Sequence, residues 1–281
     1  MNIEEAIKIA NYTLKRNKIK SHRLDSEILI SKTIQKDRNF VILNLKQKIN
    51  GNSFKFFKKL INERSKGKPV AHMLGNKDFW KYNFIISKDV LIPRPDTELI
   101  IEEVLKLTKY KKKLSILDVG IGSGCILLSI LRERKDFYGI GIDKSKKCLD
   151  ISKINSIRLG LINRSRFFKS DIDNFYLGKY DLIISNPPYI KKLDLRYLEK
   201  DVLNFEPKLA LDGGLDGISE IRKVIKRSSD LIKLKGKLVL EIAFDQKKEV
   251  INLLKENGFY INKIVKDLAG NDRCVISTKF K

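Results

Sequence analysis

Apolar residues recur every three or four positions along the first part of the chain, which is the spacing of amphipathic helices. The clearest run starts at Ile3 and continues through Ala6 to Leu14. Ser53 precedes another such run and is of a residue type that caps helices, so it is the expected start of a later helix. The pattern predicts a small all-helical domain over residues 1–75.

The spacing changes from residue 76 to residue 92, where aromatic and branched residues follow without a helical period. These residues are Phe79, Trp80, Tyr82, Phe84 and Ile86. Such a stretch is typical of short extended strands and predicts a hairpin linker over residues 76–92. A proline-containing extended segment follows, and Thr97 is the expected N-cap of the helix after it.

From residue 93 to residue 281, short apolar strands alternate with helices, which is typical of an α/β domain with a parallel sheet, the Rossmann-like class. Four successive strands are expected at 115–119, 138–142, 166–168 and 181–184, and they end at a glycine-rich turn, Asp143, Asp171 and Asn186. Because the carboxyl ends of parallel strands meet at one edge of a sheet, we expect these polar groups to share one site. Two closing strands, near 260–265 and 272–277, are expected to form a hairpin.

The glycine-rich turn after the first strand consists of Gly120, Ile121, Gly122, Ser123 and Gly124. Strand, glycine turn and helix in succession are typical of a nucleotide-binding α/β domain. The turn departs from the dinucleotide fingerprint, because Cys125 stands where the third glycine belongs. Asp118, just before the turn, would repel a pyrophosphate but attract an ammonium or sulfonium group. This favours S-adenosylmethionine over NAD as the cofactor.

The acidic residues after the second and third strands suit the rest of such a cofactor. Asp143 lies about twenty residues after the glycines, where an acidic side chain binds ribose hydroxyls. Ser145 is available to cap the next helix, which leaves Asp143 for that role. Asp171 can accept the amine of adenine, with Phe168 and Ile172 as apolar walls; its alternative role is to open a turn.

The fourth strand stops at an elbow that consists of Asn186, Pro187, Pro188 and Tyr189. Neither proline can donate to a sheet ladder, and a residue before proline is held extended, so the elbow is stiff. The Asn186 side-chain oxygen and the Pro187 carbonyl can accept the two hydrogens of a planar NH2 group, and Tyr189 can stack on it. These contacts would aim the nitrogen lone pair at a methyl donor and stabilise the developing positive charge. The alternative is a plain turn, since Asn-Pro and Pro-Pro are common in loops.

Composition narrows the class of protein only in part. The chain has 281 residues and a formal net charge of +24, which suits a polyanionic partner such as DNA or RNA. The lysines are spread rather than striped, however, which favours compositional drift. Three cysteines and two histidines show neither metal-ligand nor disulfide spacing, so we expect no metal and a cytoplasmic location. The N-terminus is acidic where a signal peptide would be basic, and no stretch approaches the ~20 apolar residues of a membrane span.

Several motifs together resemble the HemK/PrmC family, the glutamine methyltransferases that modify peptide chain release factors. The shared segments span nearly the whole chain and lie at 67–71, 92–98, 117–126, 185–190, 206–207, 210–214 and 270–273. The resemblance implies a helical N-terminal domain that helps dock the release factor, a hairpin linker, and a seven-stranded class I methyltransferase domain over residues 93–281. It implies methyl transfer from S-adenosylmethionine to the glutamine of the Gly-Gly-Gln motif of class 1 release factors.

The resemblance also assigns residues to roles. By matching motif positions, residues 120–124, Asp143, Ile172 and Asn186 would contact the cofactor, and Asp118 and Asp171 join this set through their charge and position. The residues that would hold the glutamine are Asn186, Pro187, Pro188 and Tyr189, with Asn186, Pro187 and Tyr189 in the catalytic role.

Two other functions stay open on the sequence alone. The same elbow suits a nucleic-acid methyltransferase that acts on an exocyclic amine such as that of adenine, and the charge of +24 suits that partner. Against it, no insertion is long enough for a base-reading domain. The second alternative is a non-catalytic binding protein that keeps the fold, and the intact Asp118, glycine turn, Asp143 and Asn186 argue against it.

Overall fold

The computed structural model describes residues 1–280, which form two compact units. The first, the helical unit, consists of Met1–Gly75 and Glu199–Phe205. The second, the α/β unit, consists of residues 76–198 and 206–280. The chain therefore contributes to the helical unit twice, the second time through a short segment that follows the Asn186 elbow by about a dozen positions.

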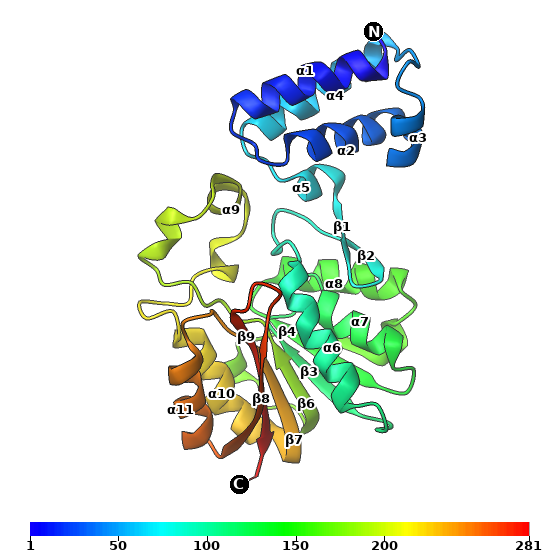
Figure 1. The fold of residues 1–281 in the computed structure, drawn as a ribbon. Coiled ribbons are helices and arrows are strands. Elements are labelled where there is room, and N and C mark those ends of the chain that lie inside the picture. Colours follow the sequence, from blue (N-terminus) through cyan, green and yellow to red (C-terminus); the bar gives the residue numbers. More distant parts are fainter. Residues whose placement is uncertain (281) are drawn as a thin grey trace. The chain divides into compact units, whose positions relative to one another are not determined.

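The helical unit contains α1 (Ile3–Arg16), α2 (His22–Ile34), α3 (Arg38–Leu43), α4 (Gly51–Ser65), α5 (Val70–Leu74) and α9 (Lys200–Phe205) (Figure 1). Apolar side chains of α1, α2 and α4, such as Leu14, Leu29 and Phe57, form its core, as the helical spacing predicts. The expected start of the later helix was wrong. α4 begins at Gly51 because the Asn50 side chain accepts from the backbone N–H of Ser53, so Ser53 lies inside the helix.

A buried ion pair joins the two parts of the helical unit. Arg64 Nε on α4 lies 2.6 Å from Asp25 Oδ2 on α2, and both side chains are 7% exposed. Arg64 Nη1 lies 3.5 Å from Asp201 Oδ2 on α9. One guanidinium therefore connects α2 and α4 with the separate segment of chain that carries α9.

The strands of the α/β unit are β1 (Asn76–Phe79), β2 (Tyr82–Ile85), β3 (Ser115–Val119), β4 (Tyr138–Asp143), β5 (Ser165–Lys169), β6 (Tyr180–Ser185), β7 (Ile232–Glu241), β8 (Phe259–Lys266) and β9 (Asp272–Lys279). Its helices are α6 (Glu98–Leu107), α7 (Cys125–Glu133), α8 (Lys146–Arg158), α10 (Ser219–Leu231) and α11 (Lys247–Glu256). The alternation of strand and helix predicted for this part of the chain is confirmed. The closing hairpin of β8 and β9 is confirmed as well.

In the described part of the chain, β3 to β9 form one sheet in the order β5-β4-β3-β6-β7-β9-β8. The pairs from β5 through to β7 are parallel, and β9 runs antiparallel to both of its neighbours. The chain adds β4 and β5 on one side of β3, then places β6 and β7 on the other. The strand order thus reverses beside β3, and ligands bind at such a switch point, beyond the carboxyl ends of the strands.

The two faces of the sheet are covered by different helices (Figure 1). Ile116 and Ile184 pack with α6, α7 and α8 in one core cluster, whereas Leu117 and Ile183 pack with α10 and α11 in the other. The alternation follows from the strand period of two residues. It leaves little of the central strands exposed, so their carboxyl ends are the part open to a ligand.

The antiparallel pair β1–β2 belongs to the α/β unit. Phe79 and Phe84 contact each other edge to face and join the core cluster that contains α6 and α7. The Asn155 side chain on α8 pairs with both backbone groups of Ile85, at 2.8 Å and 2.9 Å. The hairpin is thus packed against the rest of the α/β unit rather than extended from it.

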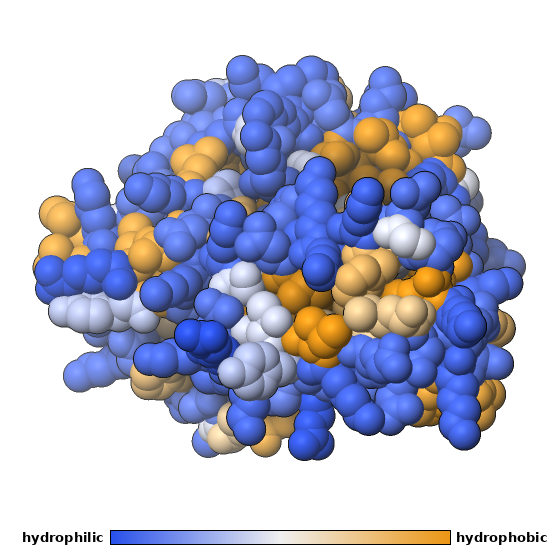
Figure 2. Space-filling view, turned by 90° about the horizontal axis from the view of Figure 1, so that it is seen from above, coloured by the Kyte–Doolittle hydropathy of each residue, from blue (hydrophilic) through white to orange (hydrophobic). Residues whose placement is uncertain are grey.

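Figure 2 shows one face of the molecule, on which hydrophilic side chains predominate and apolar ones form small patches between them. Isolated exposed apolar residues are ordinary on protein surfaces. Among the described residues, no helix combines the length and the apolar character needed to cross a bilayer.

Candidate active site

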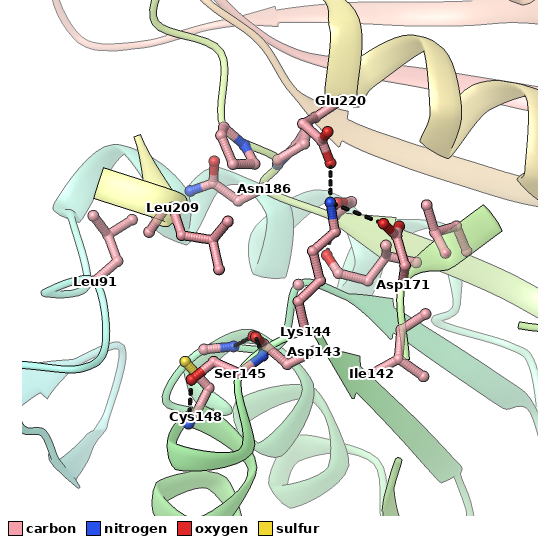
Figure 3. Close-up of a pocket in the computed structure, with 18 of the residues that line it drawn as sticks. Leu91, Ile142, Asp143, Lys144, Ser145, Cys148, Asp171, Asn186, Leu209 and Glu220 are labelled. Carbon is pink, nitrogen blue, oxygen red and sulfur yellow. Dashed lines mark hydrogen bonds and ion pairs between the residues drawn. The ribbon is translucent and has the colours of Figure 1, made fainter. Parts of the chain in front are cut away.

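A cavity of about 280 Å³ opens at the carboxyl ends of β3, β4 and β6 in the α/β unit (Figure 3). Gly120 follows β3, Asp143 ends β4, Asp171 follows β5 and Asn186 follows β6, and all four line the cavity. The expectation that the strand ends share one site is therefore met by these residues. The wall opposite the strands includes Leu91 and Leu209.

Not every residue expected at the site lines this cavity. Those that line it are Gly120, Gly122, Asp143, Asp171, Ile172, Asn186, Pro187 and Pro188. Those outside its lining are Asp118, Ile121, Ser123, Gly124 and Tyr189. Lining residues that the sequence reasoning missed include Asp89, Leu91, Lys144, Cys148, Leu209 and Glu220.

The glycine turn forms a backbone cradle at one side of the cavity. Gly120 and Gly122 have φ angles of +75° and +55°, a region that side-chain-bearing residues rarely adopt. The backbone N–H of Gly122 donates to Asp143 Oδ2 at 3.0 Å, and the Ser152 hydroxyl donates to the Gly122 carbonyl at 2.8 Å. The turn is thus held from both sides, and its bare backbone faces the cavity.

Asp143 is fixed by backbone donors at the end of β4. Its second oxygen accepts from Ser145 N at 2.8 Å, while the Ser145 side chain caps α8 by accepting from Cys148 N. Burial raises the pKa of Asp143, and the two backbone N–H groups oppose this rise. Ser145 therefore performs the capping role, as expected. Asp143 remains an oriented acceptor with lone pairs available to hydroxyls of a ligand.

Lys144 crosses the cavity beside Asp143 (Figure 3). Its ammonium lies 3.1 Å from Asp171 Oδ2 and 2.8 Å from Glu220 Oε2. Burial disfavours the ionised form of Asp171, but Lys144 outweighs it and lowers the pKa of Asp171. Asp171 Oδ1 is buried and has no hydrogen-bond partner among the described residues, so it is available to an amine. Lys144 could be suspected from its place after Asp143, whereas Glu220 lies 76 positions away and carries no local signal.

Asp118 faces away from the cavity lining. It lies between Leu117 and Val119, whose side chains pack with α10 and α11, so the strand alternation turns Asp118 toward α6 and α7. It is 1% exposed, and neither carboxylate oxygen has a hydrogen-bond partner within residues 1–280. Burial raises the pKa of Asp118 to about 7, and the nearby Asp143 adds to the rise. A positive charge in the cavity would favour the ionised form of Asp118. Asp118 could then attract a sulfonium group through its charge, as expected, but without lining the cavity.

The elbow itself lies at the carboxyl end of β6. Asn186, Pro187 and Pro188 line the cavity, and Asn186 Nδ2 donates to the Thr97 hydroxyl at 3.2 Å. Tyr189 turns away, because its hydroxyl donates to Glu241 Oε1 at the end of β7, at 3.2 Å. Burial raises the pKa of Tyr189, so its hydroxyl stays protonated and remains a donor.

A glycine-rich loop holds the elbow from behind. Gly213 N donates to the Ile190 carbonyl at 2.8 Å, and Ile190 N donates to the Leu211 carbonyl at 3.1 Å. A Cβ on Gly213 would lie 2.8 Å from Tyr189 Cα, so only glycine permits this approach. The segment 210–214, which carried part of the family resemblance, therefore acts as a support for the elbow.

A second support joins the segment 92–98 to the cavity wall. Glu206, which is 6% exposed, accepts from Ile92 N at 3.3 Å and pairs with the Arg94 guanidinium. Pro207 and Leu209, just after Glu206, line the cavity. Motifs that lie more than a hundred residues apart in sequence thus meet around one site.

The donor set fits S-adenosylmethionine. The backbone cradle of Gly120 and Gly122 permits close approach, Asp143 offers an oriented acceptor to ribose hydroxyls, and Asp171 Oδ1 offers an orphaned acceptor to adenine. Apolar residues such as Ile142 and Ile172 provide walls for a flat ring. Acidic side chains around the cavity favour a ligand with positive charge.

Comparisons with known proteins agree with this geometry. Residues 5–75 match the family model described as the PrmC N-terminal domain, and residues 95–214 match the methyltransferase small domain. The release factor glutamine methyltransferase of Buchnera aphidicola subsp. Acyrthosiphon pisum is 35% identical over 100% of this chain and 99% of its own length. The protein of the same name from Clostridium acetobutylicum is 36% identical over 99% of both chains.

Among solved structures, a methyltransferase from Pyrococcus furiosus has a similar fold, with a TM-score of 0.52 at 20% identity over 78% of this chain and 99% of that one. The likeness supports the Rossmann-like methyltransferase fold predicted from the sequence. With relatives at this identity over its full length, the chain belongs to the release factor glutamine methyltransferase family.

Proposed function

We propose that this enzyme transfers a methyl group from S-adenosyl-L-methionine to the side-chain amide nitrogen of a glutamine, the one in the Gly-Gly-Gln motif of class 1 release factors. The observation that carries the proposal is the shared cavity. Asn186 and Pro187 line the same space as Gly120, Gly122, Asp143 and Asp171. An acceptor for an amide and a cradle for the methyl donor therefore meet at one edge of the sheet.

S-adenosylmethionine supplies a methyl group on a sulfonium centre, which is electrophilic enough for direct transfer. Gly120 and Gly122 would contact it through their backbone, and Asp143 would bind its ribose. Asp171 Oδ1 would accept from the adenine amine beside Ile172. Asp118 acts from outside the lining, through its charge.

The substrate amide needs orientation more than it needs a base, because its lone pair is delocalised. The Asn186 side-chain oxygen and the Pro187 carbonyl would accept the two N–H hydrogens and turn the lone pair toward the methyl carbon. These acceptors also stabilise positive charge that develops on nitrogen. We expect the proton to leave to solvent after transfer. Tyr189 donates a hydrogen bond to Glu241 and would stabilise the shape of the elbow on the side that faces away from the cavity.

The partner is a release factor, and we place the enzyme in the cytoplasm. Curated relatives along the full chain carry the release factor name, which disfavours the nucleic-acid alternative. The three cysteines are free and buried, in keeping with a reducing compartment. We assign docking of the release factor in part to the helical unit, because residues 5–75 match the family model of the PrmC N-terminal domain.

The test measures transfer of labelled methyl from S-adenosylmethionine to three acceptors: a purified class 1 release factor, its Gly-Gly-Gln glutamine-to-alanine variant, and duplex DNA. Label on the intact release factor alone is the expected result and locates the acceptor. Label on DNA would replace the proposal by the nucleic-acid alternative. Steep loss of activity with added salt would accompany that outcome.

A second arm compares Asn186→Ala with the wild-type enzyme. We expect Asn186→Ala to lose turnover while its affinity for S-adenosylmethionine, measured by calorimetry, stays nearly unchanged. The reason is that Asn186 mainly binds and orients the substrate amide. Equal losses in turnover and cofactor affinity would contradict the role assigned to this side chain.

A further inference from the structure

A buried hydroxyl lies directly behind the amide-binding residue. Asn186 Nδ2 donates to Thr97 Oγ1 at 3.2 Å, and Thr97 is 3% exposed. Thr97 ends the short turn Pro95–Thr97 that leads into α6. It occupies the N-cap position of α6, but its side chain makes no capping hydrogen bond. The expectation that Thr97 caps this helix through its side chain was therefore wrong, and its hydroxyl serves another contact.

The orientation of the Asn186 amide decides whether it can serve the reaction. An asparagine side chain presents an acceptor oxygen on one side and a donor NH2 group on the other. Only the oxygen can accept a hydrogen from the substrate's NH2 group. With Nδ2 directed at Thr97, the oxygen is the atom left for the substrate. A reversed amide would instead place the Asn186 NH2 group against the NH2 group of the substrate, so that two donors would face each other.

Thr97 can hold this orientation only if its oxygen acts as the acceptor. A hydroxyl carries one hydrogen to donate and keeps lone pairs that can accept. Burial raises the pKa of Glu241, and the Thr97 hydroxyl opposes this rise by favouring the carboxylate. Glu241 is 2% exposed and also accepts from the Tyr189 hydroxyl at 3.2 Å. Glu241 Oε2 is buried and has no hydrogen-bond partner among the described residues. A Thr97 hydrogen turned toward this oxygen would leave Thr97 a lone pair for Asn186.

We propose that Thr97 is a positioning residue for methyl transfer, whose hydroxyl, backed by Glu241, keeps the oxygen of the Asn186 amide turned toward the acceptor nitrogen. The inference rests on the proposed function and specifies how that site discriminates a substrate amide. It gives a chemical reason for a threonine at this position: valine has the same shape but cannot accept, and serine can.

The experiment compares Thr97→Val and Thr97→Ser in the full-length enzyme, with a release factor as acceptor. Thr97→Val should lower kcat roughly 10- to 100-fold, because the amide is no longer held in one orientation. Its KM for the release factor and its affinity for S-adenosylmethionine should stay within about twofold of wild type. Thr97→Ser should keep most of the activity, since it restores the acceptor.

Thr108→Val provides the matched control. Thr108 is also buried, at 4% exposed, and its hydroxyl donates to the Val104 carbonyl at the far end of α6, outside the cavity lining. This variant reports the effect of removing a buried hydroxyl from the same helix, and its kcat should match wild type. Thermal unfolding of all variants separates a local effect from a loss of fold.

Three results would overturn the inference: an unchanged kcat in Thr97→Val, an equal loss in Thr97→Ser, or a loss of cofactor affinity and melting temperature that parallels the loss of kcat. Each leaves the proposed function intact, because wild-type transfer to the glutamine is measured in the same assay. Absence of wild-type transfer would instead overturn the proposed function and this inference with it.

Discussion

The side-chain nitrogen of Gln246 donates to the backbone carbonyl of Tyr189 at 3.0 Å, although the two residues are 57 positions apart. The same nitrogen donates to the Gly217 carbonyl at 2.9 Å, and Gln246 is 2% exposed. One amide at the start of α11 thus holds both the elbow and the glycine-rich loop behind it.

Replacing Gln246 by Leu should loosen the elbow. The change keeps the side chain near its original size but leaves two carbonyls without their donor, which costs about 1–3 kcal/mol of unfolding free energy. We expect a lower kcat toward the release factor with little change in affinity for S-adenosylmethionine. Urea unfolding, steady-state kinetics and calorimetry measure these quantities. The exposed Gln47→Leu serves as control, and a kcat equal to wild type in Gln246→Leu would contradict the anchoring role.

Gly122→Ala should weaken cofactor binding beyond its effect on stability. Its φ of +55° makes any side chain strained, at a cost of about 1 kcal/mol, and its backbone lines the cavity. Gly160, at φ +67°, has the same strain, open space around its Cβ position and no place in the cavity lining. Both alanine variants should lose similar stability.

Only the variant at Gly122 should bind S-adenosylmethionine more weakly, roughly tenfold, which corresponds to about 1.4 kcal/mol. Calorimetric titration of the two variants makes the comparison. Similar cofactor affinities in both would show that the cradle does not depend on bare backbone at position 122.

Glu241→Gln should change how stability depends on pH. Burial raises the pKa of Glu241 to about 7 from an ordinary value of 4.5. Between these values the folded state binds more protons than the unfolded state, so the free energy of unfolding falls as pH rises from about 4.5 to about 7. The variant has no carboxyl group at position 241, so this fall in the free energy of unfolding should be absent from it.

The stability of Glu241→Gln relative to wild type should therefore increase by up to ~3 kcal/mol between pH 4 and pH 8. Urea unfolding across that pH range measures it, with Glu249→Gln, an exposed position on α11, as control. Because Asp118 contributes a fall of the same sign, the diagnostic quantity is the difference between variant and wild type. Parallel curves for the two proteins would refute the assignment to Glu241.

Asp25→Ala should destabilise the helical unit. It leaves the Arg64 guanidinium, 7% exposed, without its main partner, and breaking one side of a buried pair costs roughly 3–5 kcal/mol. Amide hydrogen exchange should accelerate in α2, α4 and also α9, since Arg64 contacts Asp201 there.

Affinity for S-adenosylmethionine should stay unchanged in this variant, because its cavity lies wholly in the α/β unit. Glu4→Ala removes an exposed pair with Lys8 and should have no measurable effect. Unchanged exchange in α9 would show that Asp201 does not depend on this pair.

The pattern of apolar residues by itself determined most elements of the chain, because helix and strand periods are local properties. The order of strands and polar residues was enough to assign Asp143, Asp171 and Asn186 to one site, since parallel strands bring their carboxyl ends to one edge. The stiffness of the elbow also follows from Pro187 and Pro188 alone.

Tertiary structure decided what supports those residues. The elbow is contacted by Thr97, Glu241 and Gln246. Lys144 contacts Glu220 on α10. Each contact joins positions tens of residues apart, and burial rather than residue type gives Thr97 and Glu241 their significance. Period and propensity carry no information on which distant side chains meet, because that depends on how helices pack on the sheet. The sequence therefore predicts the chemical groups of the site, whereas only the tertiary structure shows which residues position them.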